Sequence, residues 1–373
     1  MKNPFNYLQF AKGDQFYDRR EILSDLRSRF LSGQTNVVIY GPRRYGKSSL
    51  VAELSEQLEK EGIICISFDM MKMATVDLFA NAYATRIYRR LAPVRSSVRQ
   101  IGGFFTKLRP KLTIGADGET GFSFDSVTVE MGPDELSEVL DIPQRLSAGR
   151  RVLIVMDEFQ EVEAILPDCG FERVMRSVIQ NHRNVSYVFL GSRYHLLRRI
   201  FTDHGRPFYK SALTILLDKP PVEQSVEFVI TRFESAGVSI SPEAARRLVG
   251  KISNIPYYIQ QLGFETFRLV SDSGRSKAGE GDVDEAYARL AGFNRDQYEQ
   301  AMITFSSMQK KLLIALSREE TDEFDAGYRM RHALGVSSTV NSAKKKLIED
   351  GHIERIDGIF RLSDPFFAEY LRN

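Results

Sequence analysis

The chain has 373 residues, of which 43% are hydrophobic and 27% are charged, and its formal net charge is +2. This length predicts two or three domains, and the near-neutral charge excludes a chain-wide attraction to nucleic acid or membrane. Its two cysteines, Cys65 and Cys169, are too few for a disulfide framework and are expected to be reduced thiols in a cytoplasmic protein. The aliphatic stretches are too short for a signal peptide or a membrane-spanning helix, so we expect neither.

Short apolar runs alternate with helical patterns between Asn36 and Leu217. We expect strands at residues 37–40, 63–68, 152–156, 187–190 and 212–217. Their continuous apolar character is typical of central parallel strands that are covered on both faces. Right-handed crossovers would bring the ends of these strands to one edge of the sheet, where open sheets bind ligands. The segment therefore predicts a layered α/β domain.

A β-hairpin is predicted as an insert in this domain, at about residues 107–131. Two strand-like runs, 111–114 and 122–129, flank the turn-rich segment 115–121. We do not expect this hairpin to join the main sheet.

The strand pattern stops after Pro220-Pro221, and helices are expected up to about residue 290. Ser241-Pro242-Glu243 is a strong helix start, with serine as the N-cap and proline at the first helical position. The polar segment 271–281 is predicted to be a mobile loop.

The tail of the chain is predicted to be a winged helix-turn-helix. Helical patterns at 309–317 and 337–350 are followed by a tight hairpin over 351–362. We therefore predict three domains, namely a core at 1–220, a helical domain at 221–295 and a winged helix at 296–373.

The most informative motif is Gly41-Pro42-Arg43-Arg44-Tyr45-Gly46-Lys47-Ser48, which matches the phosphate-binding pattern G-x-x-x-x-G-K-[ST]. It lies between an apolar run and a helical pattern, as this motif requires. The glycines allow backbone N–H groups to surround a polyphosphate. Lys47 can reach the β- and γ-phosphates, and the Ser48 hydroxyl can hold Mg²⁺. The motif predicts that the chain binds a nucleoside triphosphate.

Two adjacent carboxylates, Asp157 and Glu158, end the apolar run 152–156. Successive side chains of a strand point to opposite sides, so the two residues should have different roles. Asp157 is predicted to hold Mg²⁺, directly or through water, and Glu158 to orient and polarise the attacking water. The alternative is that this acidic pair only marks a solvated strand end.

A third candidate element is Gly191-Ser192-Arg193, which follows the apolar run 187–190. Ser192 and Arg193 could both lie beside the γ-phosphate, where a guanidinium stabilises charge or senses the nucleotide. The alternative is an N-cap serine followed by a surface arginine. The five histidines are scattered and show no metal-binding spacing, so no competing catalytic centre is predicted.

Together these residues resemble the archaeal-type ATPase family of the STAND group of P-loop NTPases, close to AAA+ proteins. The resemblance rests on the phosphate-binding loop, on Asp157-Glu158-Phe159-Gln160 and on Gly191-Ser192-Arg193. It also includes two N-terminal segments, Asn3-Pro4-Phe5 and residues 16–22. Asn254-Ile255-Pro256-Tyr257-Tyr258 is similar to the family's lid motif G-x-P, although Asn254 stands at the glycine position.

The resemblance implies an AAA+-like parallel sheet with a helical lid domain and a C-terminal winged helix. It implies that ATP and Mg²⁺ bind between core and lid, with Pro256 near the base. The residues expected around the phosphates are Gly41, Pro42, Arg43, Arg44, Tyr45, Gly46, Lys47, Ser48 and Ser49. The implied function is an ATP-driven molecular switch.

Three functions remain open from the sequence. The chain could be an ATPase whose output is a contact with a protein partner or with a second copy of itself. It could instead be an ATP-regulated DNA-binding protein that uses the winged helix, with 337–350 as recognition helix. It could also be a nucleotide-binding scaffold that hardly hydrolyses ATP.

Charge favours a protein output over DNA reading by the tail. Residues 301–373 contain eleven Lys or Arg and eleven Asp or Glu, including the local run Lys344-Lys345-Lys346. A net charge of zero gives poor support for a phosphate-backbone contact. The better basic feature is Arg86, Arg89, Arg90, Arg95, Arg99, Lys107, Arg109 and Lys111, with no acidic residue among them. This run could bind nucleic acid or an acidic partner, or could be a solvated face.

Overall fold

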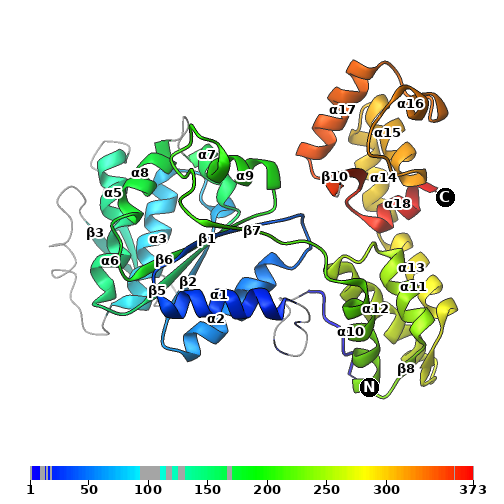
Figure 1. Cartoon of the computed structure of the whole chain (residues 1–373), viewed down its shortest axis with the longest axis horizontal. Helices are drawn as coiled ribbons and strands as arrows, with labels where there is room; N and C mark the ends of the chain where they lie inside the picture. Colours follow the sequence, from blue (N-terminus) through cyan, green and yellow to red (C-terminus); the bar gives the residue numbers. More distant parts are fainter. Residues whose placement is uncertain are drawn as a thin grey trace. The chain divides into compact units, whose positions relative to one another are not determined.

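The computed structural model describes residues 2–8, 13, 16, 19–92, 110–114, 120–124, 131–165, 170–356 and 358–372. Residue contacts divide the chain into two compact units (Figure 1). The unit with the large sheet, here the sheet unit, comprises Arg19–Gly41 and Lys47–Leu217. The other, here the helical unit, comprises Met1–Asp18, Pro42–Gly46 and Asp218–Asn373.

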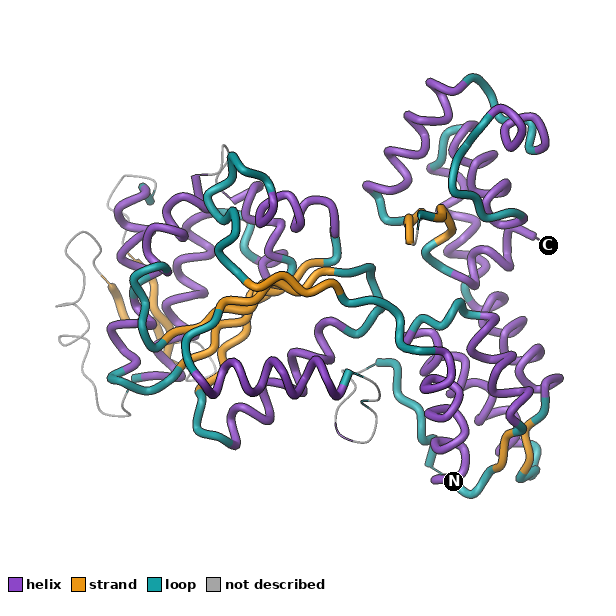
Figure 2. Tube along the Cα trace, in the orientation of Figure 1, coloured by secondary structure: helices purple, strands orange, loops and turns teal. Residues whose placement is uncertain are grey.

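The sheet unit is built on five parallel strands in the order β2-β5-β6-β1-β7 (Figure 2). The strands are β1 (Asn36–Tyr40), β2 (Ile64–Asp69), β5 (Val152–Asp157), β6 (Val185–Gly191) and β7 (Leu213–Leu216). Each coincides with a predicted strand, with ends that differ by one or two residues. The expectation that all are covered on both faces is wrong for β7, an edge strand with three exposed residues of four.

Helices cover both faces of the sheet. In Figure 1, α1 and α2 lie on one face, and α3, α5, α6 and α8 lie on the other. The helices of this unit are α1 (Arg20–Ser32), α2 (Lys47–Lys60), α3 (Val76–Leu91), α5 (Pro133–Leu140), α6 (Ile142–Ser147), α7 (Val162–Ile165), α8 (Gly170–Ile179) and α9 (Tyr194–Thr202), with 3-10 turns η2 (Met70–Lys72) and η3 (Phe159–Glu161). Because helices cover both faces, the carboxyl ends of the strands remain open for a ligand. The phosphate-binding loop follows β1 at this edge, and the acidic pair lies there at the end of β5.

The predicted insert is present as a separate two-stranded sheet. Strands β3 (Pro110–Ile114) and β4 (Thr120–Phe124) pair in antiparallel register, with Pro110 opposite Phe124. The predicted turn, apart from its ends, and Val127–Val129 lie outside the described residues, as does Cys169.

The helical unit has one continuous apolar core that includes residues of both the predicted lid and the predicted winged helix. Its first helices are α10 (Val222–Ser235), α11 (Pro242–Lys251), α12 (Pro256–Asp272) and α13 (Glu280–Phe293). Phe5 is anchored here, with its ring 5.3 Å from that of Phe233. A Cβ at Gly263 would lie 2.6 Å from the Phe5 ring, so glycine is required there.

Two expectations for this region are wrong. Strands do not stop after Pro221, because β8 (Ser239–Ile240) and β9 (Lys277–Ala278) form a short parallel pair. The segment 271–281 is therefore not a free loop, since β9 lies in its middle and α13 begins near its end. The start of α13 is capped by Asp282, which accepts a hydrogen bond from Gly279 N at 2.9 Å.

The tail contains the helices and hairpin that the sequence predicts. Its elements are α14 (Arg295–Thr304), α15 (Ser307–Arg318), α16 (Ala326–Arg331), α17 (Ser337–Glu349), β10 (Ile353–Ile356), β11 (Ile359–Leu362) and α18 (Pro365–Arg372). Val340, Ala343 and Leu347 form the buried face of α17, as their spacing predicts. Among the described residues, no helix is long and apolar enough to cross a membrane.

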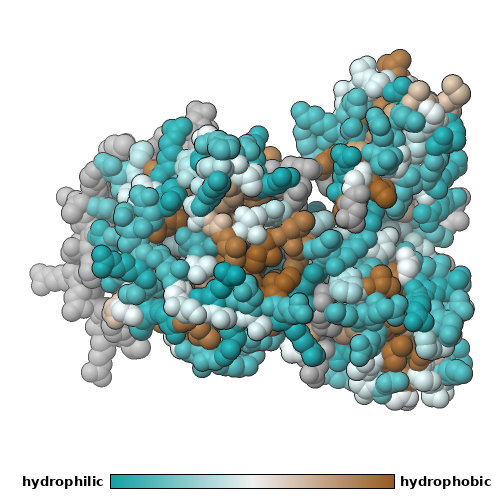
Figure 3. Space-filling view, viewed as in Figure 1, coloured by the Kyte–Doolittle hydropathy of each residue, from teal (hydrophilic) through white to brown (hydrophobic). Residues whose placement is uncertain are grey.

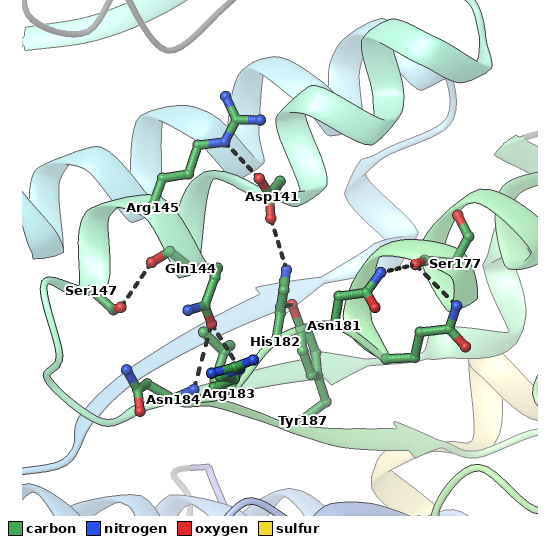
Figure 4. Close-up of polar contacts among 12 residues, drawn as sticks. Asp141, Gln144, Arg145, Ser147, Ser177, Asn181, His182, Arg183, Asn184 and Tyr187 are labelled. Atoms are coloured by element: carbon green, nitrogen blue, oxygen red, sulfur yellow. Dashed lines mark hydrogen bonds and ion pairs between the residues drawn. The ribbon is translucent and has the colours of Figure 1, made fainter.

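A polar network of the sheet unit runs from the half-exposed Asp141 and Arg145 to the buried His182 and Tyr187 (Figure 4). His182 lies between two partners, with Nδ1 3.1 Å from the Tyr187 hydroxyl and Nε2 3.4 Å from Asp141 Oδ1. Arg145 Nε donates to the other oxygen of Asp141 at 2.5 Å. Burial alone would raise the pKa of Asp141, but the hydrogen bonds from His182 and Arg145 outweigh it and lower that pKa. The network fixes the connection into β6.

Tyr187→Phe should lower the free energy of unfolding by about 1–3 kcal/mol, because it leaves a buried nitrogen of His182 without its partner. The matched control is Tyr209→Phe, which removes a similar contact to His204, 3.3 Å away at the exposed surface. The control should stay within about 0.5 kcal/mol of the wild type. Urea denaturation measures both, and equal losses would contradict a structural role for the buried network.

Candidate nucleotide-binding site

The predicted phosphate-binding loop joins the end of β1 to the start of α2. Gly41 lies tightly against β7, because an added Cβ would be 2.5 Å from the Leu217 carbonyl oxygen. The segment Pro42–Gly46 then turns the chain, and α2 begins at Lys47. Pro42 and Ser49 are half-buried and Arg43 is exposed. Glycine at the first position is thus required by packing, and not only by a ligand.

The backbone of this loop has the alternating geometry that binds anions. Arg44 and Gly46 have positive φ angles of 68° and 86°, whereas Tyr45 between them does not. Alternation of left- and right-handed residues turns successive N–H groups toward one point, which makes a concave anion site. The N-terminus of α2 adds its own free N–H groups beside it.

Lys47 and Ser48 are held at the carboxyl edge of the sheet. The Lys47 side chain is buried, and its Nζ donates a hydrogen bond to Gly41 O at 2.7 Å. Ser48 Oγ donates to Asp157 Oδ2 at 3.1 Å. The first residues of α2 and the last residue of β5 therefore meet, as the sequence predicts.

Asp157 and Ser48 present oxygen atoms suited to Mg²⁺. Burial raises the pKa of Asp157, as does the neighbouring charge of Glu158, although hydrogen bonds from Glu158 N and Ser48 oppose the rise. Mg²⁺ is usually held by one or two protein oxygens together with phosphate oxygens and water. This pair fits that donor set.

Glu158 is turned away from Asp157 and is fixed by three hydrogen bonds. Its φ angle is 52°, and Oε2 accepts from Ser192 N at 3.0 Å, Ser192 Oγ at 2.9 Å and Gln160 Nε2 at 2.6 Å. Burial alone would raise the pKa of Glu158, but the hydrogen bonds from Gln160 and Ser192, with the charge of Lys47, lower it. The carboxylate is thus ionised and oriented.

Gln160 is a site residue to which the sequence assigned no role. It is buried, and a Cβ at Gly191 would lie only 2.1 Å from its Oε1. An alanine at position 191 would therefore push the Gln160 amide out of its present position. Its signal in the sequence was its place in Asp157-Glu158-Phe159-Gln160, one of the segments that carry the family resemblance.

Arg193 and Pro256 are placed differently from the other predicted residues. Arg193 Nη1 lies 3.7 Å from Glu161 Oε1, and its side chain is 57% exposed. Pro256 begins α12 in the helical unit, where the next residue, Tyr257, donates its N–H to Arg44 O at 3.3 Å. Asn254, at the glycine position of the lid motif, has a φ of 57°. Asparagine tolerates this left-handed conformation better than most residues, which accounts for the departure.

Comparisons with known proteins agree with this architecture. Residues 28–200 match a family described as an AAA domain, and residues 296–373 match a probable winged helix domain. No curated protein sequence matches the chain. The Walker-type ATPase PABY2304 of Pyrococcus abyssi has a similar structure, with 18% identity, a TM-score of 0.66 and coverage of 99% of this chain and 100% of that one.

Two further similar structures are proteins of Aeropyrum pernix. The ORC2 protein, in ADPNP–ADP complexes, has 14% identity and a TM-score of 0.61, with coverage of 100% of this chain and 97% of that one. The ORC1 protein in complex with DNA has 15% identity and a TM-score of 0.53, with coverage of 96% and 93%. At these identities the likeness concerns the fold.

The chain is therefore a P-loop ATPase that carries an AAA domain and a C-terminal winged helix domain. The sequence-based expectations of this fold and of ATP hydrolysis are confirmed. The STAND assignment, the domain boundaries and the roles of individual site residues stay predictions.

Glu158→Gln should reduce ATP hydrolysis by about 10²–10⁴-fold while ATP binding is retained, because an amide cannot polarise water as a carboxylate does. The amide oxygen can still accept from Ser192, so the fold should be kept. Steady-state phosphate release and nucleotide titration measure the two effects. Glu56→Gln, at an exposed pair with Lys60, is the control. Equal turnover in Glu158→Gln and wild type would exclude the role assigned to Glu158.

Proposed function

We propose that this ATPase is a Mg²⁺-dependent switch of the STAND type whose output is a contact with a protein partner or a second copy of the chain. The observation that carries the hydrolytic part is the Glu158 carboxylate, which accepts three hydrogen bonds at one oxygen. A carboxylate fixed in this way is suited to orient an attacking water.

The other roles follow from the same edge of the sheet. Lys47 binds the β- and γ-phosphates, and Ser48 and Asp157 hold the metal. Mg²⁺, when bound, supplies charge neutralisation at the phosphates. Ser192 fixes Glu158, and Arg193 can exchange its partner Glu161 for the γ-phosphate, because the 3.7 Å contact lies at an exposed position.

A protein output is supported by the lysines of α17, because each has a partner within the winged helix. Lys344 Nζ lies 5.2 Å from the ring centroid of Phe360, and Lys346 pairs with Asp350 at 2.8 Å. Lys345 lies 3.9 Å from the carboxylate of the residue one turn later. Lysines with such partners produce a weak field for a DNA backbone.

Exposed apolar side chains also support a protein contact. Leu213 and Leu216 on edge strand β7 are 37% and 53% exposed, and Figure 3 shows an apolar area over the strand region that Figure 1 labels β1 and β7. On the winged helix, Met330 and Val336 flank the turn between α16 and α17 and are 83% and 70% exposed. Exposed apolar edge strands and patches are typical of protein-binding surfaces.

The alternative is a nucleic-acid partner, which the first part of the basic run favours. Arg86, Arg89 and Arg90 on α3 line an open hollow of about 400 Å³ beside β2. Arg86 donates to Ser67 O, and Arg90 pairs with Glu59. The remaining side chains of the run lie outside the described residues. The structurally similar ORC1 protein of A. pernix was solved in complex with DNA, which also supports this alternative.

Lys47→Ala should abolish stabilisation by ATP and Mg²⁺. A ligand at a hundred times its dissociation constant adds about 2.7 kcal/mol to the free energy of unfolding, enough for a clear shift in melting temperature. Lys60→Ala, at the exposed end of the same helix, should keep the full shift. A thermal melt with millimolar ATP measures it, and an unshifted wild type would contradict nucleotide binding.

Two measurements test whether the ATPase acts through a protein contact or through DNA. They are binding to duplex DNA and sedimentation of the protein in each nucleotide state. We expect an ATP-dependent change in the size of the Glu158→Gln variant, alone or with a partner, and no DNA binding at about 50 mM salt. DNA binding that falls steeply with salt would contradict this proposal. Charge reversal of Arg89, Arg90, Arg95 and Arg99, compared with reversal of Lys344, Lys345 and Lys346, would then identify the binding element.

A further inference from the structure

Arg44 and Tyr45, two neighbouring residues of the phosphate-binding loop, contact residues of the winged helix through their side chains. We propose that Asp364 and Arg361 of the winged helix hold this loop in its anion-binding conformation, with Arg44 as the positioning residue. The proposal rests on the ATPase activity, and it adds a means by which the winged helix sets nucleotide affinity. All atoms of these contacts belong to the helical unit, which includes Pro42–Gly46.

Arg44 has acidic and aromatic partners at once. Its Nη1 lies 3.5 Å from Asp364 Oδ2, and its guanidinium lies 4.9 Å and 4.6 Å from the ring centroids of Tyr257 and Tyr258. Its carbonyl oxygen accepts the hydrogen bond from Tyr257 N. A planar guanidinium suits such combined pairing and stacking.

Tyr45 provides the second connection. Only 1% of the residue is exposed, and its hydroxyl accepts a hydrogen bond from Arg361 Nη2 at 3.2 Å. Arg361 is itself paired with Glu354 at 3.1 Å, and both of these side chains are largely buried. The contact therefore ends on a rigid pair of residues in the β10–β11 hairpin.

The position of Asp364 is fixed by hydrogen bonds that do not involve Arg44. Asp364 accepts hydrogen bonds from Phe366 N at 2.9 Å and from Phe367 N at 3.3 Å, both in the first turn of α18. It also accepts a hydrogen bond from the Tyr298 hydroxyl at 3.4 Å. An acceptor with a fixed position can hold a flexible arginine in one geometry.

The loop needs such support because Arg44 is not glycine. Its φ of 68° lies in the left-handed region, which the anion-binding geometry requires at this position. A residue with a Cβ is disfavoured there, whereas glycine adopts this conformation freely. The contacts with Asp364 and the two tyrosine rings offset the cost, and their loss shifts the loop toward other conformations.

This coupling must act in both directions. If docking of the winged helix favours the loop conformation that binds phosphate, then bound nucleotide must favour the docked winged helix by the same factor. Hydrolysis and product release can thereby change the contacts of the winged helix.

The test separates the Arg44 backbone from its side chain. Arg44→Ala should weaken binding of a fluorescent ADP analogue by roughly five- to tenfold, because it removes the contacts and keeps the left-handed cost. Arg44→Gly should bind more tightly than Arg44→Ala, because glycine adopts the left-handed conformation without support. Asp364→Asn should weaken binding in the wild-type background and have no further effect in Arg44→Gly. Asp350→Asn, at the exposed pair with Lys346, is the control and should be silent.

A second measurement keeps the test valid if a variant is less stable. In the wild type, ADP should increase hydrogen-exchange protection of α18, and this increase should be lost in Asp364→Asn. Equal affinity losses in Arg44→Ala and Arg44→Gly would overturn the proposal, as would unchanged affinity and protection in Asp364→Asn. A wild type that binds no nucleotide would instead contradict the function of the site itself. Arg44→Gly thus distinguishes backbone support from a direct contact of the side chain with ligand.

Discussion

The site depends on the partial burial of two adjacent carboxylates, Asp157 at the end of β5 and Glu158 directly after it. Carboxylates that leave water must receive hydrogen bonds or positive charge, and the surrounding structure supplies these from separate elements. Asp157 receives the Ser48 hydroxyl from α2, whereas Glu158 receives Ser192 and Gln160. The register of the parallel sheet places these donors together, because β1, β5 and β6 all end at the same edge. The strand order that forms the α/β fold therefore also places the hydrogen-bond donors that the two carboxylates need.

The sequence predicted the elements whose local pattern is strong. Inner strands such as β5 were found because a continuous apolar run has few alternatives, and α17 was found because its apolar residues share one face. The exposed edge of β7 was missed, since position at an edge depends on strand order and not on composition. The short pair β8–β9 was missed because two-residue strands leave no periodic signal.

The candidate site shows the same limit. Lys47, Ser48, Asp157 and Glu158 could be predicted because motif spacing carries their chemistry. The contacts of Arg44 with Asp364 and of Tyr45 with Arg361 join residues that are far apart in the chain. A local sequence pattern therefore cannot predict them. The lid position Asn254 was explained only by its φ angle, which shows that the site requires a left-handed backbone and tolerates asparagine.

The close approach of Gly191 to Gln160 has an evolutionary consequence. A single methyl group at position 191 would overlap the amide oxygen that is 2.1 Å from the ideal Cβ. An alanine there would displace the Gln160 amide, so the hydrogen bond to Glu158 would need a different glutamine rotamer or another donor. We therefore expect these two positions to change together across homologues, although Gly191 ends β6 and Gln160 lies in the 3-10 turn η3. Their joint pattern would mark chains that hold the attacking water's carboxylate in the same manner.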